Sequence, residues 1–280
     1  MPLLDYVKNT LRRYEIKPRK RFGQSFLIDE NVIIRMIEYA NVNSKDRVLD
    51  VGSGLGFLAE LLAEKTDKVI AVESDFKLAN ILKEKFSENR KIEVYFADFL
   101  KLNLKNKFNK VVSSPPYSIA SKILFKLLDE KFDLAVLLLQ KEFALRMIAL
   151  PASKDYGRLT VMTYIKAEVE KLEETSSMAF YPKPKVDSTI IRLKPRERPF
   201  KISDMALFEK IVKFMFTQRN RKVRNVLQKL IKLGILETQI ISLDSIPFLD
   251  RRVFTLKPEE FGEITDAFNR KITESKHVRA

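Results

Sequence analysis

RVLDVGSGLGFLAELLAEK, residues 47–65, is the stretch that decides the fold. Its opening, RVLDVG, carries the apolar and β-branched side chains of a buried strand. In its closing part, FLAELLAEK, apolar side chains recur at the spacing of an amphipathic helix. Three glycines lie around the junction, where the backbone can turn tightly. The stretch therefore predicts a strand that turns directly into a helix.

The same alternation of short apolar runs and helical patterns continues to residue 140. It favours a parallel sheet with helices on both faces, an α/β fold of Rossmann-like type. Ligands of such sheets bind at the carboxyl ends of the strands, near the point where the strand order reverses. Further strands are expected at residues 68–74, 91–98, 110–114 and 133–140, with helices at 76–86 and 121–130.

A second, smaller domain is predicted after the segment KPRERP, residues 194–199, which reads as a linker. Helical periodicity follows it, and Gly234 suits the end of a helix. We therefore expect two domains, 1–196 with the sheet and a basic N-terminal segment, and 197–280 as an all-α domain.

The composition excludes several classes of chemistry. The chain has no cysteine, so disulfides, thiolate metal sites and a cysteine nucleophile are excluded. Its single histidine, His277, lies in a polar tail, so we expect neither a histidine base nor a metal. No apolar run reaches the roughly 18–20 residues of a membrane span, and the N-terminus shows no signal-peptide pattern. We expect a cytoplasmic protein with no membrane partner, most simply a monomer.

The positive charge is concentrated in two segments. Of the formal net charge of +15, residues 1–22 carry seven Lys/Arg and two acids, and residues 183–230 carry fourteen Lys/Arg and four acids. The rest of the chain sums to zero. Concentrated charge favours a polyanionic partner, namely a nucleic acid. A generally basic proteome or an ion-paired surface suited to high temperature is the alternative.

The first predicted strand ends in a glycine loop, Gly52, Gly54 and Gly56, preceded by Asp50. A dinucleotide fingerprint needs a glycine at position 57, where the chain has Phe57. The pattern G-x-G-x-G after an acid is instead the nucleoside-binding loop of methyltransferases that use S-adenosylmethionine. A purely structural turn is the alternative, but it explains one or two of these glycines rather than three.

The next two strand ends carry acids. Glu73 lies 21 residues after Gly52, where an acid can accept hydrogen bonds from both hydroxyls of a ribose. Asp98 can accept a hydrogen bond from an exocyclic amine such as adenine N6, and Phe99 can cover the ring. Each acid taken alone would be an ordinary surface residue, and it is their placement at successive strand ends that points to a nucleoside.

The fourth strand ends in Ser114-Pro115-Pro116-Tyr117, which fits the Asp/Asn/Ser-Pro-Pro-aromatic pattern of amino-methyltransferases. An aromatic amine is a poor nucleophile because its lone pair is delocalised. The Ser114 hydroxyl and the Pro115 carbonyl can accept its two hydrogens, which favours a pyramidal nitrogen. The prolines have no N–H to compete for these acceptors, and Tyr117 can stack on a flipped base. A proline turn with a packing tyrosine is the alternative.

Over residues 17–260 the chain resembles the rRNA adenine dimethyltransferase family, which modifies two adjacent adenosines near the end of small-subunit rRNA. The segment RFGQSFLID (21–29) resembles that family's Gly-Gln-Asn/His-Phe-Leu motif, and AFYPKPKVDS (179–188) its Phe-x-Pro-x-Pro-Lys-Val-Asp-Ser motif. FTQRNRKVRNVL (216–227) is similar to the basic motif that opens its helical domain.

The resemblance implies S-adenosylmethionine as cofactor, S-adenosylhomocysteine as product, and rRNA within a precursor small ribosomal subunit as partner. It implies that Phe180 stacks on the target base beside Tyr117, so the expected catalytic residues are Ser114, Pro115, Tyr117 and Phe180. Expected cofactor contacts are Ser25, Leu27, Gly52, Gly54, Gly56, Glu73, Ser74, Asp98, Phe99 and Ser114. Expected RNA contacts are Arg19, Lys20, Arg21, Lys183, Lys185, Arg219, Arg221, Lys222 and Arg224, of which Arg221 and Arg224 would share a helix face.

The chain departs from the family at two positions. Ser114 stands where the family usually has asparagine, and Ser25 where it usually has asparagine or histidine. Serine keeps an acceptor but has a shorter reach than the Asn amide. Two alternatives therefore stay open beside small-subunit dimethylation: adenine-N6 methylation of another nucleic acid (large-subunit rRNA or DNA), and a catalytically idle RNA-binding paralogue.

Overall fold

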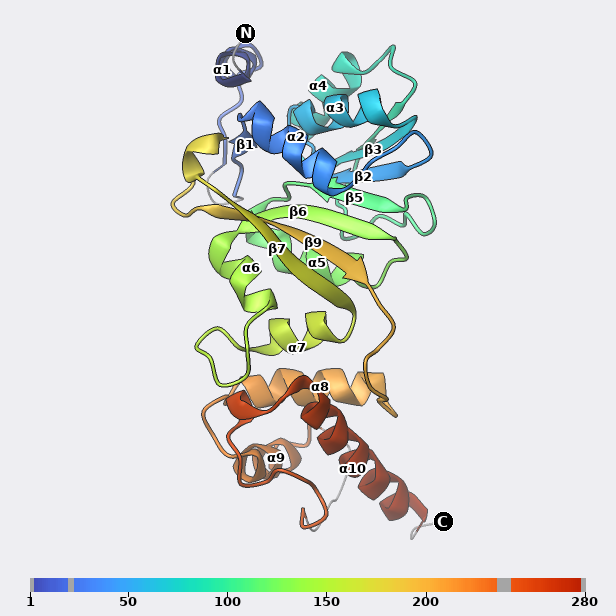
Figure 1. Ribbon diagram of the computed structural model, residues 1–280, viewed down its shortest axis with the longest axis vertical. Helices are drawn as coiled ribbons and strands as arrows, with labels where there is room; N and C mark the ends of the chain where they lie inside the picture. The colour runs from blue at the N-terminus through green and yellow to red at the C-terminus, as the bar shows by residue number, and fades with distance from the viewer. Residues whose placement is uncertain (1–2, 20–22, 236–242, 278–280) are drawn as a thin grey trace. The chain divides into compact units, whose positions relative to one another are not determined.

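The computed structural model describes residues 3–19, 23–235 and 243–277. The chain divides into two compact units, and the first comprises Met1–Ala144 and Glu168–Pro195. Its centre is a sheet with the strand order β4-β3-β2-β5-β6-β9-β7 (Figure 1). The strands are β2 (Arg47–Val51), β3 (Lys68–Glu73), β4 (Ile92–Phe96), β5 (Lys110–Ser113), β6 (Leu134–Gln140), β7 (Ala167–Thr175) and β9 (Ser188–Pro195).

The five strands expected from the sequence are present and parallel, which confirms the α/β fold. From β2 the chain moves outward through β3 to β4, and it then returns to place β5 on the other side of β2. The strand order therefore reverses between β2 and β5, which is where a ligand crevice is expected in an open parallel sheet. β9, whose sequence begins with STIIRL, pairs antiparallel with β6.

Three helices cover one face of the sheet. α2 (Glu30–Tyr39), α3 (Phe57–Lys65) and α4 (Phe76–Lys85) share one apolar cluster with alternate residues of the strands. α5 (Ala120–Leu127) connects the parallel strands β5 and β6, and here the chain moves across the sheet in the direction opposite to the step from β2 to β4. Because such crossovers are right-handed, α5 lies on the opposite face. Asp75 caps α4 by accepting from the N–H groups of Lys77 and Leu78.

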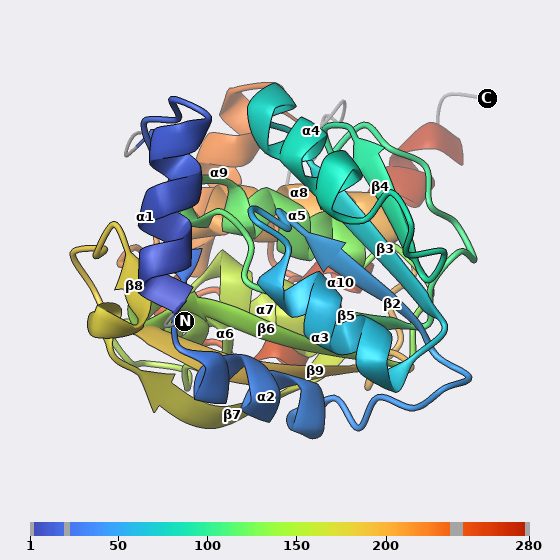
Figure 2. The ribbon, with the colours of Figure 1, turned by 90° about the horizontal axis from the view of Figure 1, so that it is seen from above.

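The segment around residue 26 lies beside the connection between β7 and β9. β1 (Phe26–Leu27) pairs antiparallel with β8 (Phe180–Tyr181), which brings two motif segments about 150 residues apart in the sequence side by side. Figure 2 shows α1 (Leu3–Arg13) next to this pair. Two short 3₁₀ turns, η2 (Tyr117–Ile119) and η3 (Ser177–Ala179), complete the unit, and α6 (Lys141–Met147) leads out of it.

The second unit comprises Leu145–Ala167 and Arg196–Ala280. At its centre, α8 buries one face against the helices around it. The segment 145–167, which the sequence analysis assigned to the first domain, belongs here. Its α7 has an apolar face that needs α8, and the Tyr156 hydroxyl donates to the Leu256 carbonyl at 2.7 Å. The elements are α7 (Arg158–Tyr164), α8 (Met205–Phe216), α9 (Val223–Lys232), η4 (Val253–Thr255) and α10 (Pro258–His277).

Within the described part of the chain, no helix is both long and apolar enough to cross a membrane.

Candidate active site

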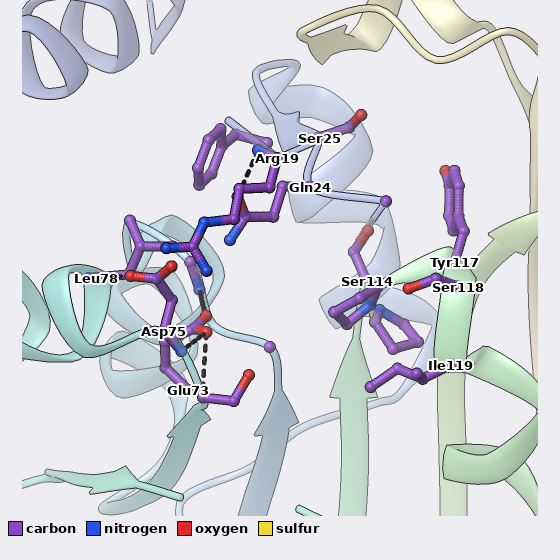
Figure 3. A pocket seen from close by; sticks show the side chains of 17 residues that line it. Arg19, Gln24, Ser25, Glu73, Asp75, Leu78, Ser114, Tyr117, Ser118 and Ile119 are labelled. Atoms are coloured by element: carbon purple, nitrogen blue, oxygen red, sulfur yellow. Dashed lines mark hydrogen bonds between the residues drawn. The ribbon is translucent and has the colours of Figure 1, made fainter. Parts of the chain in front are cut away.

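A cavity of about 300 Å³ opens in the first unit at the carboxyl ends of β2, β3 and β5 (Figure 3). It lies where the strand order reverses, so the fold and the cavity point to the same place. Residues from four separate strand ends and loops converge on it. Its lining is Arg19, Gly23, Gln24, Ser25, Phe26, Gly52, Gly54, Glu73, Ser74, Asp75, Leu78, Ser114, Pro115, Pro116, Tyr117, Ser118 and Ile119.

Two glycines form the floor of the cavity. Gly52 and Gly54 have φ values of +80° and +58°, in the left-handed region that other residues avoid. A Cβ atom at Gly52 would lie 2.7 Å from Cδ of Pro116, so the loop after β2 touches the loop after β5. Only glycine allows this close approach. Gly56 does not line the cavity, since it is buried against Leu82 and Phe86.

Glu73 ends β3 with a carboxylate that is held by backbone N–H groups. Its Oε1 accepts from Ser74 at 2.7 Å and from Asp75 at 2.8 Å, and its Oε2 accepts from Gly54 at 2.9 Å. The side chain is 7% exposed, and this burial raises the pKa of Glu73. The three donors fix the carboxylate at the cavity wall, with remaining lone pairs available to a hydroxyl ligand.

Asp50 lies beneath the glycine loop and borders a smaller pocket of about 60 Å³ beside the cavity. Its side chain is 2% exposed, and among the described residues its Oδ2 has no hydrogen-bond partner. Burial raises the pKa of Asp50 to about 7, with a smaller contribution from the nearby Glu73 charge. A buried acceptor without a partner is the kind of atom that a polar ligand group satisfies.

The loop after β5 is fixed by a residue that the sequence analysis did not identify. Ser113 Oγ donates to the Val51 carbonyl at 2.8 Å and accepts from the Val51 N–H at 3.2 Å. This clip joins β5 to β2 one residue before Ser114. Ser114 and Pro115 therefore enter the cavity opposite Gly52 with little freedom, and Ser114 also borders the smaller pocket.

Tyr117 lines the same cavity, and its hydroxyl lies 2.5 Å from Oγ of Ser188. Burial raises its pKa to about 12, so the phenol stays protonated near neutral pH. Phe180 is 3% exposed and meets Tyr117 edge-to-face, with ring centroids 6.2 Å apart. The two predicted stacking aromatics are therefore neighbours, but Phe180 is not part of the cavity lining in this structure.

The other predicted cofactor contacts divide into two groups. Ser25 and Ser74 line the cavity, whereas Leu27 borders only the smaller pocket. Asp98 is exposed outside the lining, where its Oδ1 accepts from the Leu100 N–H at 2.9 Å. Phe99 is also outside the lining, since it is buried below the Lys126 ammonium, which lies 5.0 Å from the ring centroid.

Several cavity residues were not among the predicted contacts. Gln24 and Asp75 are polar, and Leu78 supplies an apolar wall from α4. Gln24 lies within the motif segment RFGQSFLID and Asp75 lies two residues after Glu73, so these two could have been found from the sequence, whereas nothing in the sequence points to Leu78. Arg19, predicted as an RNA contact, also borders the cavity, and Figure 3 shows its side chain pointing toward Asp75.

The predicted RNA-binding residues also differ in their placement. Lys20 and Arg21 lie outside the described residues, and Lys183 and Lys185 are exposed. Arg221 and Lys222 are exposed as well, but α9 begins at Val223 with Lys222 as its N-cap. The prediction that Arg221 and Arg224 share a helix face is therefore wrong, because Arg221 precedes the helix.

Arg219 is tied into the second unit. Its guanidinium donates to the Lys154 carbonyl at 2.6 Å and to the Ser153 carbonyl at 2.8 Å. It also lies over the Phe254 ring, 5.5 Å from the centroid. These contacts give Arg219 a structural role that sequence spacing alone does not reveal.

A sequence model of the family described as ribosomal RNA adenine dimethylase matches residues 15–250. The chain belongs to the ribosomal RNA adenine dimethylase family. Among curated relatives of this dimethylase, the "Probable ribosomal RNA small subunit methyltransferase A" of Methanosarcina acetivorans is 40% identical over 263 residues, 93% of this chain and 97% of the relative. The protein of the same description from Pyrococcus abyssi is 40% identical over 259 residues, 91% of this chain and 94% of the relative.

Two solved structures resemble the dimethylase fold over most of its length. A dimethyladenosine transferase from Plasmodium falciparum has a TM-score of 0.76 and 27% identity, covering 87% of this chain and 97% of that structure. The 23S rRNA methyltransferase ErmE has a TM-score of 0.62 and 30% identity, covering 87% of this chain and 99% of that structure. The likeness confirms the methyltransferase fold of the sheet.

Proposed function

We propose that this chain transfers methyl groups from S-adenosylmethionine to the N6 amines of two adjacent adenosines near the 3′ end of small-subunit (16S) rRNA, giving N6,N6-dimethyladenosine. The substrate is the rRNA of a precursor small subunit during ribosome biogenesis in the cytoplasm, and the enzyme acts as a monomer. The observation that carries the proposal is the meeting of the glycine loop, Glu73 and the Ser114–Tyr117 loop around one cavity.

The cavity residues fit the proposed cofactor. Gly52 and Gly54 line the cavity without side chains, and Glu73 offers acceptor lone pairs for ribose hydroxyls. The unpartnered Oδ2 of Asp50 suits a cationic amino group next to the glycine loop. When bound, S-adenosylmethionine supplies an electrophilic methyl group attached to a positively charged sulfur.

Ser114 and Pro115 are the groups that prepare the target amine. The Ser114 hydroxyl and the Pro115 carbonyl each accept one N–H hydrogen, so the nitrogen becomes pyramidal and its lone pair becomes available. No strong base is required, because the nitrogen releases its proton readily once it has become positively charged. Tyr117, protonated near neutral pH, acts through its ring face rather than as a base.

The RNA surface is supplied by exposed cations. Lys183 and Lys185 follow Phe180 closely in sequence, and Arg221 and Lys222 lie directly before α9 in the second unit. Cations contact phosphates without reading sequence, so their role is to hold the rRNA while the target base enters the cavity. Phe180 is buried and is not part of the cavity lining in this structure, so its contact with the base requires movement of the side chains around it.

Methylation of large-subunit rRNA is the second candidate, because ErmE, named as a 23S rRNA methyltransferase, is 30% identical and is covered over 99% of its length. The higher TM-score of the dimethyladenosine transferase and the names of the curated relatives favour the small subunit.

The test is methyl incorporation into under-modified small subunits, large subunits and DNA under the same conditions. Incorporation confined to the small subunit is expected, and preferential labelling of large-subunit rRNA would overturn the substrate assignment.

A further inference from the structure

Helix α1 precedes the residues that the family model matches, which begin at residue 15. It is nevertheless well packed on the first unit. Val7 and Leu11 are buried in an apolar cluster of their own, together with Leu78 and Ile81 of α4. An amphipathic helix that buries this face has a defined place on the protein.

This cluster forms the outer support of the proposed cofactor cavity. Two of its members, Phe26 and Leu78, also line the cavity. A third, Leu55, lies within the glycine loop, next to Gly54. Side chains of α1 therefore touch the reverse side of the walls that face the ligand.

Polar contacts fasten the C-terminal end of α1 to α4. The Lys77 ammonium donates to the carbonyls of Tyr14 and Glu15, at 3.3 and 3.2 Å. Carbonyls at the end of a helix lack helical partners, so a lysine there satisfies them and complements the helix dipole. The Tyr14 hydroxyl donates to Oε2 of Glu84 at 2.8 Å, which gives α4 a second hold.

The chain turns from this fastened end toward the cavity. Glu15 has a φ of +49°, a conformation that non-glycine residues rarely adopt, and Lys77 holds its carbonyl there. Ile16 then packs in the α1 cluster, and Arg19 reaches the cavity lining. The Arg19 N–H donates to Oε1 of Gln24 at 2.7 Å, so Arg19 and Gln24 form one border of the cavity.

We propose that α1 is a positioning helix for the cofactor, held in place by Lys77 and Tyr14, which keeps Arg19 and Gln24 at the border of the cavity. This inference rests on the proposed function, because the ligand is S-adenosylmethionine. Lys77 and Tyr14 do not line the cavity and do not touch the target base. Loosening their contacts therefore weakens cofactor binding, while the rate of methyl transfer from the saturated enzyme stays the same.

The test is the double variant Lys77→Met and Tyr14→Phe in the full chain. Methionine keeps the apolar stem of Lys77 without its ammonium, and phenylalanine keeps the ring of Tyr14 without its hydroxyl. The matched control is Lys83→Met, which removes an exposed lysine from the same helix. The measurements are the Kd of S-adenosylhomocysteine by calorimetry, KM and kcat for methyl transfer, and hydrogen exchange over residues 3–13.

The double variant is expected to raise Kd and KM about five-fold, which corresponds to about 1 kcal/mol, and to accelerate exchange in α1. The kcat is expected to stay within about two-fold, and Lys83→Met is expected to change neither constant. An unchanged Kd would overturn the inference, whether or not exchange in α1 rises. A loss of kcat with an unchanged Kd would also overturn it. Failure of the unaltered chain to bind S-adenosylhomocysteine would instead overturn the proposed function on which the inference rests.

Discussion

Ser114 is the residue on which the proposed catalysis depends most. It lines the cavity one residue after the Ser113 clip, and it offers a hydroxyl where the resembling family usually has asparagine. Ser114→Ala removes one of the two acceptors for the target amine. We expect kcat to fall about ten-fold or more, a loss of about 1.4 kcal/mol or greater in the barrier. Single-turnover methyl transfer measures this.

The control for Ser114→Ala is Ser121→Ala, an exposed serine on α5 outside the cavity lining. Its kcat should equal that of the unaltered chain. A Ser114→Ala enzyme with full activity would contradict the proposed role of the hydroxyl. If the unaltered chain itself showed no transfer to a competent subunit, a catalytically idle RNA-binding protein would be the better description.

Asp50 gives the cofactor-free protein an unusual pH dependence. Its carboxyl keeps its proton in the folded chain up to about pH 7 but loses it near pH 4 when the chain unfolds. The folded state therefore binds more protons between these values, and this residue lowers the free energy of unfolding as the pH rises. Its contribution is of the order of 1 kcal/mol per pH unit between about pH 5 and pH 6, and the slope falls to about half as the pH reaches 7.

Denaturant unfolding at several pH values, compared between the unaltered chain and Asp50→Asn, measures that contribution. The difference in unfolding free energy between the two proteins should shift with pH across this window, because asparagine does not titrate. A difference that stays constant from pH 5 to pH 7 would show that Asp50 is already ionised in the folded chain.

At the scale of elements, the glycine loop between β2 and α3 depends on contact with the loop after β5. Gly52→Ala places a methyl group 2.7 Å from the Pro116 ring and also strains the backbone. Gly234→Ala in the second unit is the matched control, since Gly234 has a φ of +62° but no atom within 4 Å of the added Cβ. In both variants the free energy of unfolding should fall by about 1 kcal/mol, because alanine is strained at a positive φ.

Only Gly52→Ala should also weaken binding of S-adenosylhomocysteine, because only there does the loop shift into the cavity. Calorimetry on the two variants measures this. Equal cofactor affinity in both would contradict the importance of the contact between the two strand-end loops.

The turn between α8 and α9 carries two arginines with different roles: Arg219 is bonded within the second unit, and the exposed Arg221 is proposed to bind RNA. Arg219→Ala removes the side-chain donor of the Lys154 carbonyl and one of the two donors of the Ser153 carbonyl, so the unfolding free energy should fall by about 1 kcal/mol. Arg221→Ala should leave the unfolding free energy unchanged and weaken rRNA binding. It should also reduce the slope of log K against log salt concentration by about 1, because one phosphate contact is lost. Thermal unfolding and salt titrations of RNA binding separate the two. If both variants lost the same RNA affinity and both kept the stability of the unaltered chain, the different roles given to Arg219 and Arg221 would be contradicted.

Local patterns predicted the elements of the first unit well. The strands from β2 to β6 were predictable because buried parallel strands are short apolar runs, and the Gly52 loop and Glu73 were predictable because they end such strands. Contacts between distant segments were not predictable. Nothing near Ser113 in the sequence indicates that it bonds to Val51, and nothing near Arg219 indicates that its donors are used by residues 153–154.

At the scale of the whole molecule, the chain is divided differently from its sequence pattern. The linker near residue 196 separates the two units, but residues 145–167 belong with the helices that follow it. Their apolar faces are completed only by α8, which lies far along the chain, so periodicity within the segment cannot assign it. The two basic segments likewise fall in both units, which favours an rRNA that contacts each of them.

The most direct test of the account is mass spectrometry of small-subunit rRNA after incubation with this protein and S-adenosylmethionine, using subunits that lack the modification. We predict N6,N6-dimethyladenosine at two adjacent adenosines near the 3′ end, and at least about ten-fold less product with Ser114→Ala over the same short reaction time. Unmodified adenosines in a competent subunit, or methylation only at other positions, would contradict the central claim.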